Sequence, residues 1–256
     1  MTDSTALKKS DVTHPSLQLY TVRNDLERDL PATIARVARI GFRQVEPFGF
    51  VDRAGALRDA LDASDLSAPT AHARLVGEDV DAIFRAASVL GASTVYDPFI
   101  DPDRWLSRDG VAGIAAEMGE IARVAAGHGI AVGYHNHAFE FRSRIDGTSA
   151  FEVFADAVAD EVQLEVDTYW AAVGGEADVP ALLARLGDRV TALHIKDGPL
   201  TDNDIDQVAV GSGSMDVPAI LAAAPQALRV VELDDFAGDA FDAVADSFTY
   251  LEGIQA

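Results

Sequence analysis

The sequence predicts a single-domain (β/α)8 barrel. Eight short apolar, strand-like runs alternate with eight stretches that carry apolar residues at helical spacing. The chain has 256 residues, and a barrel of this kind usually needs about 250. With 48% hydrophobic residues the chain can bury a large core. No linker composition divides it, so we expect a flexible leader over residues 1–14 and one barrel over residues 15–256.

The strand-like and helix-like segments follow one another in strict order. Strands are expected at residues 17–22, 42–46, 67–72, 93–96, 130–134, 162–166, 190–195 and 228–233. Helices are expected at residues 31–40, 54–63, 78–90, 111–128, 149–158, 179–186, 217–224 and 239–251. Pro31 and Pro180 stand near helix starts, and Gly41 and Gly187 follow helix ends, which are the places these residues favour.

Composition excludes several classes of function. The formal net charge of −22 repels polyanions, and no basic patch is visible, so nucleic-acid binding is not expected. No apolar run is long enough to predict a membrane span or a signal peptide. The absence of cysteine rules out disulfides and thiol catalysis. We therefore expect a cytoplasmic protein.

Four polar side chains stand at the ends of the last four strand-like runs. They are Glu140, Asp167, His194 and Glu232, separated by 27, 27 and 38 residues. A single acidic residue in such a place is usually a helix cap or an ion-pair partner, but barrel active sites form where the strand ends meet. Three carboxylates and an imidazole suit Mn²⁺ best, with Mg²⁺, Co²⁺ and Zn²⁺ open. Such an ion, chelated by a sugar's hydroxyl and carbonyl, would acidify the adjacent C–H and stabilise an enediolate.

Further polar residues are expected at the same mouth. Glu46, His72 and Asp97 end the second, third and fourth runs and are candidate substrate contacts. Lys196 lies two residues beyond His194, so alternation points both side chains the same way. It is either a solvated strand-end residue or a cation that stabilises an oxyanion or carries a proton.

Two histidines and a glutamate complete the polar candidates. His135 and His137 share one face of the fifth strand, either as hydrogen-bonded structural residues or as a substrate contact and a proton-transfer group respectively. Glu165 precedes Asp167 by two and should support the ligands from behind, paired with Lys196 or an arginine.

Two tryptophans are candidate substrate contacts. Trp170 is expected to wall a sugar pocket or pack against the next helix, and Trp105 to form an aromatic lid from the loop at residues 97–109. The glycines at 211 and 213 are a weak phosphate-binding signal, because a helix-capping turn explains them equally well. An unphosphorylated or glycosidic substrate is therefore preferred.

Three segments carry a family resemblance. Residues 133–141 (GYHNHAFEF), 164–170 (LEVDTYW) and 193–197 (LHIKD) resemble the signature segments of the xylose isomerase-like barrel superfamily, in particular its sugar phosphate isomerase/epimerase and inosose dehydratase-like branch. The resemblance implies that Glu140, Asp167, His194 and Glu232 bind the metal. As in ketose 3-epimerases of this superfamily, it also implies that Glu140 and Glu232 exchange protons on opposite faces of the substrate. Where those epimerases have histidine, this chain has Trp170.

The resemblance leaves the reaction open. The first expectation is a metal-dependent isomerase or epimerase acting on a small sugar or keto-sugar, with a homo-oligomer allowed. The main alternative is a lyase or dehydratase that removes water or an aglycone from a keto-sugar, an inosose or a 3-keto-glycoside, including C-glycoside cleavage. A non-catalytic sugar-binding barrel is a third reading, but the complete ligand set disfavours it. Six histidines are too few for the trinuclear site of the related endonuclease IV group.

Overall fold

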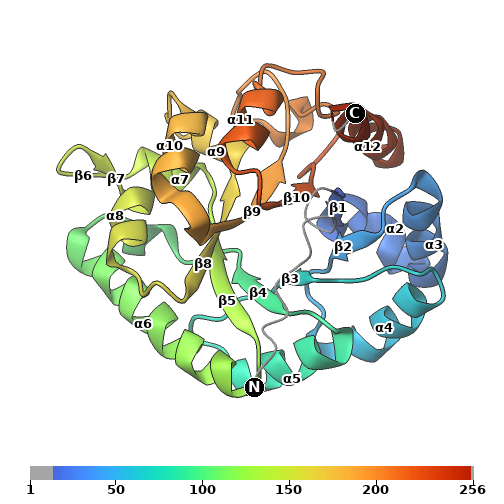
Figure 1. The fold of residues 1–256 in the computed structure, drawn as a ribbon, viewed down its shortest axis with the longest axis horizontal. Coiled ribbons are helices and arrows are strands. Elements are labelled where there is room, and N and C mark those ends of the chain that lie inside the picture. Colours follow the sequence, from blue (N-terminus) through green and yellow to red (C-terminus); the bar gives the residue numbers. More distant parts are fainter. Residues whose placement is uncertain (1–13, 255–256) are drawn as a thin grey trace.

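The computed structural model describes residues 14–254, so the expected leader lies outside the described residues apart from His14. Eight parallel strands form one sheet in the order β2-β1-β10-β9-β8-β5-β4-β3, and isolated bridges between residues 44 and 67 and between 48 and 72 join its two edges. Figure 1 shows the resulting ring of strands inside a ring of helices. The strands are β1 (Ser16–Gln18), β2 (Gln44–Glu46), β3 (Thr70–His72), β4 (Thr94–Asp97), β5 (Ala131–His135), β8 (Val162–Asp167), β9 (Val190–Ile195) and β10 (Leu228–Val231). This confirms the predicted (β/α)8 barrel.

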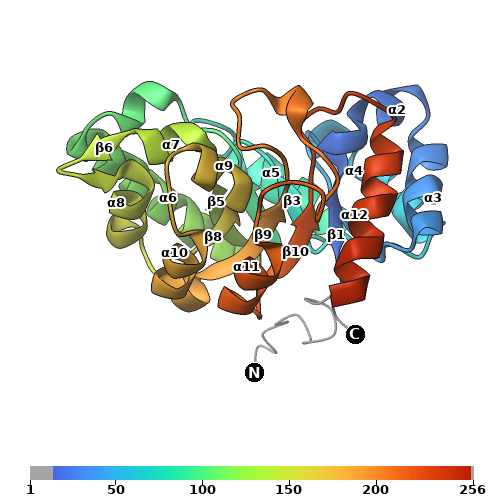
Figure 2. The same cartoon turned by 90° about the horizontal axis from the view of Figure 1, so that it is seen from above.

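One main helix follows each strand on the outside of the barrel. Figure 2 shows the last helix beside the first units, which closes the outer ring. All eight predicted helices are present, with ends shifted by at most three residues. They are α3 (Leu30–Ile40), α4 (Ala54–Asp62), α5 (Val80–Leu90), α6 (Arg108–Gly127), α8 (Ala150–Ala157), α10 (Val179–Leu186), α11 (Val217–Ala223) and α12 (Ala240–Ile254). None of the helices in the described part of the chain could span a membrane.

Local sequence explains where these helices begin and end. Asp29 accepts a hydrogen bond from the backbone N–H of Ala32 at the start of α3, and Asp79 caps α5 in the same way. Gly91 ends α5 in the left-handed conformation that glycine adopts without steric cost. Each helix turns its apolar face inward, so the main core lies between helices and strands.

Several short elements were not predicted. The helices α2 (Arg23–Arg28), α7 (Ala138–Arg142) and α9 (Thr168–Val173), and the hairpin of β6 (Arg144–Ile145) and β7 (Thr148–Ser149), are too short to show a periodic pattern. The helices α7 and α9 matter most, because they directly follow β5 and β8 and fix the side chains at the ends of those strands.

Candidate metal centre

The expected polar ring is present at the carboxyl ends of the strands. Glu46 ends β2, His72 ends β3, His135 ends β5, Asp167 ends β8 and Glu232 directly follows β10. All five side chains are buried. Buried charges need partners, and these residues find them mainly in one another, in His194 and in Lys196.

Four residues offer one set of convergent donor atoms, which we call the Asp167 group: His135, Asp167, His194 and Glu232. One ligand atom from each lies within 4.8 Å of the other three. His194 Nδ1 is 2.7 Å from Glu232 Oε2. Three of the four residues expected to bind metal therefore lie together, joined by His135.

A second set, the Glu165 group, consists of His72, His135, Glu165 and His194, whose donor atoms also lie within 4.8 Å of one another. His72 Nε2 is 2.5 Å from Glu165 Oε2, and His135 Nδ1 is 3.2 Å from the same oxygen. Glu46 Oε1 lies beside this group, 3.0 Å from His72 Nε2 and 2.8 Å from His194 Nε2. Glu165 thus pairs with histidines and not with Lys196 or an arginine, the partners that the sequence had suggested, because the ammonium of Lys196 lies among Asp167, Glu232 and Asp234 instead.

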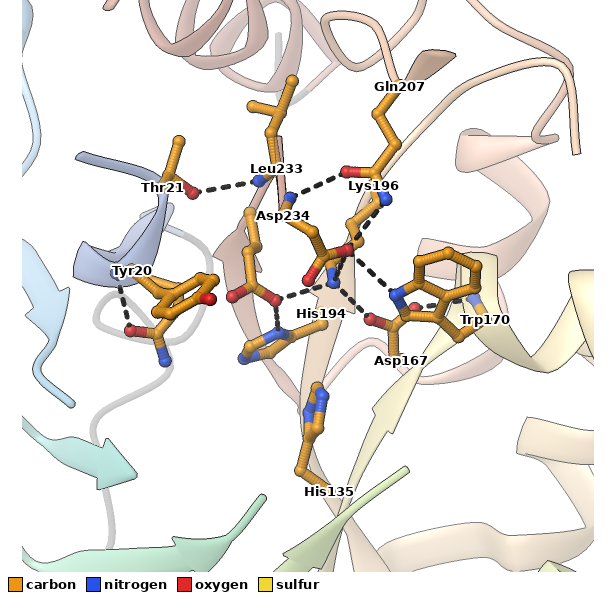
Figure 3. Close-up of polar contacts among 12 residues, drawn as sticks. Tyr20, Thr21, His135, Asp167, Trp170, His194, Lys196, Gln207, Leu233 and Asp234 are labelled. Atoms are coloured by element: carbon orange, nitrogen blue, oxygen red, sulfur yellow. Dashed lines mark hydrogen bonds and ion pairs between the residues drawn. The ribbon is translucent and has the colours of Figure 1, made fainter. Parts of the chain in front are cut away.

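Lys196 lies among three carboxylates (Figure 3). Its Nζ is 2.9 Å from Asp167 Oδ2, 2.8 Å from Glu232 Oε2 and 2.6 Å from Asp234 Oδ2. Burial alone would lower the pKa of Lys196, but Asp167, Asp234 and Glu232 outweigh it and raise the pKa well above its ordinary value. The lysine is therefore a fixed, buried cation rather than a solvated strand-end residue.

Asp234 is held in place by two neighbours besides Lys196 (Figure 3). The Trp170 indole N–H donates to Asp234 Oδ2 at 2.9 Å. Gln207 donates its amide to the same oxygen at 2.8 Å and accepts the backbone N–H of Asp234 at 2.8 Å. These bonds fix the position of the Asp234 carboxylate, which in turn orients Lys196. They also use the only N–H donor of the Trp170 indole within the protein.

Asn136 fixes the position of Asp167. Its side-chain carbonyl accepts the backbone N–H of Asp167 at 3.0 Å, and its amide donates to the Asp167 carbonyl at 3.2 Å. Asp167 also caps α9, because its Oδ1 accepts the N–H of Trp170 at 2.8 Å. The carboxylate is therefore oriented from both sides.

Glu140 lies outside both groups. Its Oε1 accepts the Tyr134 hydroxyl at 2.6 Å, and its Oε2 accepts the backbone N–H of His137 at 2.9 Å. Burial raises the pKa of Glu140 to about 8, against the lowering effect of the Tyr134 hydrogen bond. Its role as a metal ligand stays a prediction, while the geometry puts His135 with the other three expected ligands.

Trp105 and Asp97, two further expected substrate contacts, are buried and hydrogen-bonded within the protein. Trp105 is completely buried, donates to the Ile100 carbonyl and packs on Tyr134 and Phe154, so it belongs to the core and cannot be an exposed lid. Asp97 is also buried, and its carboxylate accepts the backbone N–H groups of residues 75, 76 and 99, which ties two loops together.

His137 is the most accessible of the mouth histidines. Its ring is half-buried, stacks on Phe139 and meets Phe99 edge to face. Burial, followed by the charge of Lys196, lowers the pKa of His137 to about 4. The imidazole is therefore neutral at neutral pH and able to accept a proton.

The charges of the centre are strongly coupled. Burial would lower the pKa of His72, but Glu46 and Glu165 outweigh it and raise the pKa to about 10. Burial raises the pKa of Asp167 to about 6 against the opposing charge of Lys196. Burial would likewise raise the pKa of Glu232, but Lys196 and His194 hold it below its ordinary value. The carboxylates thus favour the protonated forms of His72 and His194, whereas burial and neighbouring positive charge lower the pKa values of His135 and His137.

The glycine-containing turn after β9 binds an anion that belongs to the protein itself. The backbone N–H groups of Gly211, Gly213 and Met215 donate to the Asp197 carboxylate at 3.0 Å each. These amides are therefore already used by the Asp197 carboxylate.

Gly213→Ala is expected to destabilise this turn. A Cβ at position 213 would lie 2.2 Å from Asp197 Oδ1 and 2.3 Å from the Gly198 backbone nitrogen. Overpacking of this kind costs about 1–3 kcal/mol, to be measured as the free energy of unfolding in urea. Gly127→Ala, where nothing lies within 4 Å of the added Cβ, is the control and should not destabilise the protein. Equal stability of the two variants would contradict the close packing of the turn around Gly213.

Four residues that position the side chains at the mouth could hardly be predicted from the sequence. Asp234 and Gln207 lie outside the strands, and Tyr134 and Asn136 adjoin His135, which is a more obvious candidate ligand. Only the alternation of Glu232 and Asp234 along the chain could have pointed to Asp234. The hydrogen bonds of Gln207 and Asn136 depend on neighbours 27 and 31 residues away.

Comparison with known proteins agrees with the fold. Residues 34–227 match the model of the xylose isomerase-like TIM barrel family, and the chain belongs to this family. No curated protein matches the sequence. Three solved structures share the fold at low sequence identity.

The first is a sugar phosphate isomerase/epimerase from Parabacteroides distasonis, 22% identical over 97% of each chain, with a TM-score of 0.80. The second is a D-allulose 3-epimerase from Methylomonas sp., 16% identical over 94% of this chain and 97% of that one, with a TM-score of 0.69. The third is the IolI protein, solved with a zinc atom, 14% identical over 94% of this chain and 96% of that one, with a TM-score of 0.68.

The donor set of the Asp167 group fits a divalent metal ion. It mixes two imidazoles with two carboxylates, all four side chains are buried, and their donor atoms converge. Such a set suits Mn²⁺, Co²⁺ or Zn²⁺. The buried carboxylates also outnumber the single ammonium of Lys196, so their net negative charge favours the binding of a cation.

Proposed function

We propose that the protein is a divalent-metal-dependent sugar isomerase or epimerase that removes a proton next to a carbonyl group. The observation that carries the proposal is the convergence of the four donor atoms of the Asp167 group at the mouth of the barrel. Mn²⁺ is the preferred ion. The ion, when bound, would polarise a sugar carbonyl and acidify the neighbouring C–H.

The chain's own residues supply the groups that handle protons and charge. Glu232 is ionised and lies at the mouth, so its carboxylate can take a proton from carbon. The neutral imidazole of His137 can exchange a proton on another side of the substrate. Lys196, fixed by three carboxylates, can donate a hydrogen bond to an oxygen on which negative charge develops.

A lyase acting on a keto-sugar is the alternative, and Trp170 favours it. The indole N–H of Trp170 is used by Asp234, so position 170 does not offer the substrate hydrogen bond that the resemblance implies for 3-epimerases. In that reaction His137 would take the proton from carbon and return it to the leaving oxygen as water or an aglycone departs from the next carbon, while Lys196 would donate a hydrogen bond to the carbonyl oxygen.

The names of similar structures support an enzyme acting on a small sugar. They include a sugar phosphate isomerase/epimerase and a D-allulose 3-epimerase, and the zinc atom of the IolI structure supports a divalent ion. Of the two reactions, these names favour isomerisation or epimerisation.

Incubation of the Mn²⁺-loaded protein with ketoses, inososes and 3-keto-glycosides in D₂O tests the proposal. We expect NMR to show deuterium entering next to the carbonyl of at least one compound without loss of a substituent. Release of water or aglycone would instead establish the lyase. Absence of both across the panel would contradict proton abstraction.

Glu140→Gln distinguishes the observed geometry from the ligand set implied by resemblance. Because both Glu140 oxygens are hydrogen-bonded within the protein, we expect the bound Mn²⁺, measured by elemental analysis, to equal that of the wild type. Glutamine has the size of Glu140 and keeps one acceptor oxygen. Because the pKa of Glu140 is raised to about 8, the neutral amide also resembles the uncharged form of this carboxyl group. Loss of the metal from this variant would show that Glu140 is a ligand after all.

A further inference from the structure

We propose that the mouth of the barrel contains a further subsite, which binds an aromatic substituent of the sugar substrate. This subsite, the outer pocket, lies beside the metal centre between the loops that follow β2, β3 and β4, on the side of the ring where α4 and α5 lie (Figure 1). The inference rests on the proposed function, because it takes the metal centre as the place where the sugar reacts. It adds the class of substrate, a keto-sugar that carries an aryl group.

The outer pocket begins at a residue of the metal centre. One of its walls is the side chain of His72, whose Nε2 lies 3.0 Å from Glu46 Oε1 and whose ring stacks on that of His194 with centroids 5.1 Å apart. The cavity has a volume of about 430 Å³, within the range of roughly 300–1,000 Å³ that is usual for small-molecule sites. A substrate whose sugar ring lies at the metal centre can therefore place a substituent in the outer pocket.

Most of the lining of the outer pocket is apolar. Its apolar residues are Val51, Ala73, Ala82, Ile83 and Pro98. Two acidic residues, Glu78 and Asp79, also line it, but both are exposed, and Asp79 already accepts the backbone N–H of Ala82. Sugar hydroxyls against such a surface would lose hydrogen bonds to water without gaining new ones, whereas an apolar group is stabilised by the same contact. The outer pocket thus suits a part of the substrate that is not sugar.

Exposed apolar and aromatic side chains gather around this part of the mouth. Val51 is 36% exposed, and Tyr20 and Phe99, which follow β1 and β4, are each 39% exposed. Phe99 adjoins Pro98 of the outer pocket, and its ring centroid lies 6.2 Å from that of His137, the proposed proton-exchange residue. Apolar side chains clustered beside a site mark a surface that a ligand covers. Phe99 therefore offers an incoming ring an aromatic surface close to the reacting groups.

Arginines accompany these exposed rings. The guanidinium of Arg74, which also lines the outer pocket, lies 5.5 Å from the ring centroid of Phe99, and that of Arg23 lies 4.2 Å from the centroid of Tyr20. Although the chain has 42 acidic residues, neither arginine forms an ion pair with a carboxylate within residues 14–254. A guanidinium attracts the face of an aromatic ring. This favours an aromatic substituent over an aliphatic one of the same size.

Isothermal titration with matched pairs of glycosides tests the outer pocket by binding alone. The phenyl and methyl β-glycosides of glucose, galactose and xylose lack the ketone, so the Mn²⁺-loaded protein cannot remove a proton next to a carbonyl in them. We expect the phenyl member of at least one pair to bind about 10-fold tighter or more, because its ring leaves water for the outer pocket. The same preference is expected in the metal-free protein, since the apolar lining holds no metal ligand.

Two variants locate the preference at the outer pocket. Val51→Ser and Phe99→Ala should each reduce it by about threefold or more, while the affinity for the methyl glycosides stays unchanged. Val89→Ser is the matched control, because Val89 is an exposed valine near the end of α5, outside the lining of the pocket. It should keep the preference of the wild type. Circular dichroism checks that all three variants fold.

Equal binding of the phenyl and methyl members in all three pairs overturns the outer pocket, and so does a phenyl preference that Val51→Ser and Phe99→Ala leave unchanged. The competing occupant is an apolar side chain from a second copy of the chain. In that case the wild type shows no phenyl preference, and Val51→Ser lowers the molecular mass measured by light scattering, which also overturns the proposal.

The outcomes separate this inference from the proposed function. A phenyl preference in a protein that exchanges no deuterium into any keto-sugar supports the outer pocket and contradicts metal-dependent proton removal. Deuterium exchange into a free ketose by a protein without phenyl preference overturns the outer pocket and leaves the proposed function intact.

Discussion

Asp167→Asn is expected to weaken Mn²⁺ binding at the Asp167 group by more than about 100-fold, because loss of a partner that only supports a ligand already costs 10–100-fold. Asp167 is completely buried and is oriented by Asn136 and by the start of α9. Deuterium exchange into a responsive substrate should fall to background. Isothermal titration with Mn²⁺ and NMR in D₂O measure the two effects.

The fold should survive this change. Asparagine caps helices about as well as aspartate does, so it can still accept the Trp170 N–H that Asp167 Oδ1 accepts now. The midpoint of thermal unfolding of the metal-free variant should therefore stay close to that of the wild type. Unchanged Mn²⁺ affinity in a folded Asp167→Asn protein would contradict the assignment of this residue as a ligand.

Lys196→Met is expected to lower the free energy of unfolding of the metal-free protein by about 3–5 kcal/mol, the usual cost of removing one partner from a buried charge pair. Lys196 is 1% exposed and lies within 3 Å of three carboxylates. Methionine fills similar space without charge, so the carboxylates would lose their cation. Urea denaturation followed by circular dichroism measures the change.

Arg142→Met is the control for charge removal in general. Its ion pair with Asp202 is exposed, and surface pairs contribute about 0–1 kcal/mol. Saturating Mn²⁺ should restore more stability to Lys196→Met than it adds to the wild type, because a bound ion can take over the charge balance. Equal stability of the two variants would show that Lys196 does not hold the carboxylates together.

The barrel could be predicted from the sequence because each βα unit repeats the same local signals. Apolar runs end at polar residues, and caps such as Asp79 and breaks such as Gly91 mark the helix limits. These signals are local, so they need no knowledge of the fold. The short helices α7 and α9 carry no such pattern, since a helix of five or six residues shows too few turns.

Only part of the candidate metal centre could be predicted from the sequence. Asp167, His194 and Glu232 converge as their strand positions predict, because parallel strands bring their carboxyl ends to one mouth. Position along the chain could not show that Glu140, on α7, bonds to Tyr134 and the backbone while His135 joins the other three. Those choices depend on side-chain contacts between different strands.

Trp105 and Asp234 illustrate the same limit. A tryptophan in a long loop after a barrel strand is compatible with a lid, but this loop folds back and buries Trp105 against Tyr134 and Phe154. Asp234 resembles many other acidic residues in an acidic chain, and only the structure shows that it joins Lys196, Gln207 and Trp170.

Anomalous diffraction from crystals of the Mn²⁺-loaded protein tests the central claim most directly. A peak at the mouth of the barrel, within about 2.0–2.3 Å of donor atoms of Asp167, His194 and Glu232, is the predicted result. A map with no peak at the strand ends, or with Mn²⁺ bound only on the outer surface, would contradict a metal centre at this mouth and the chemistry proposed for it.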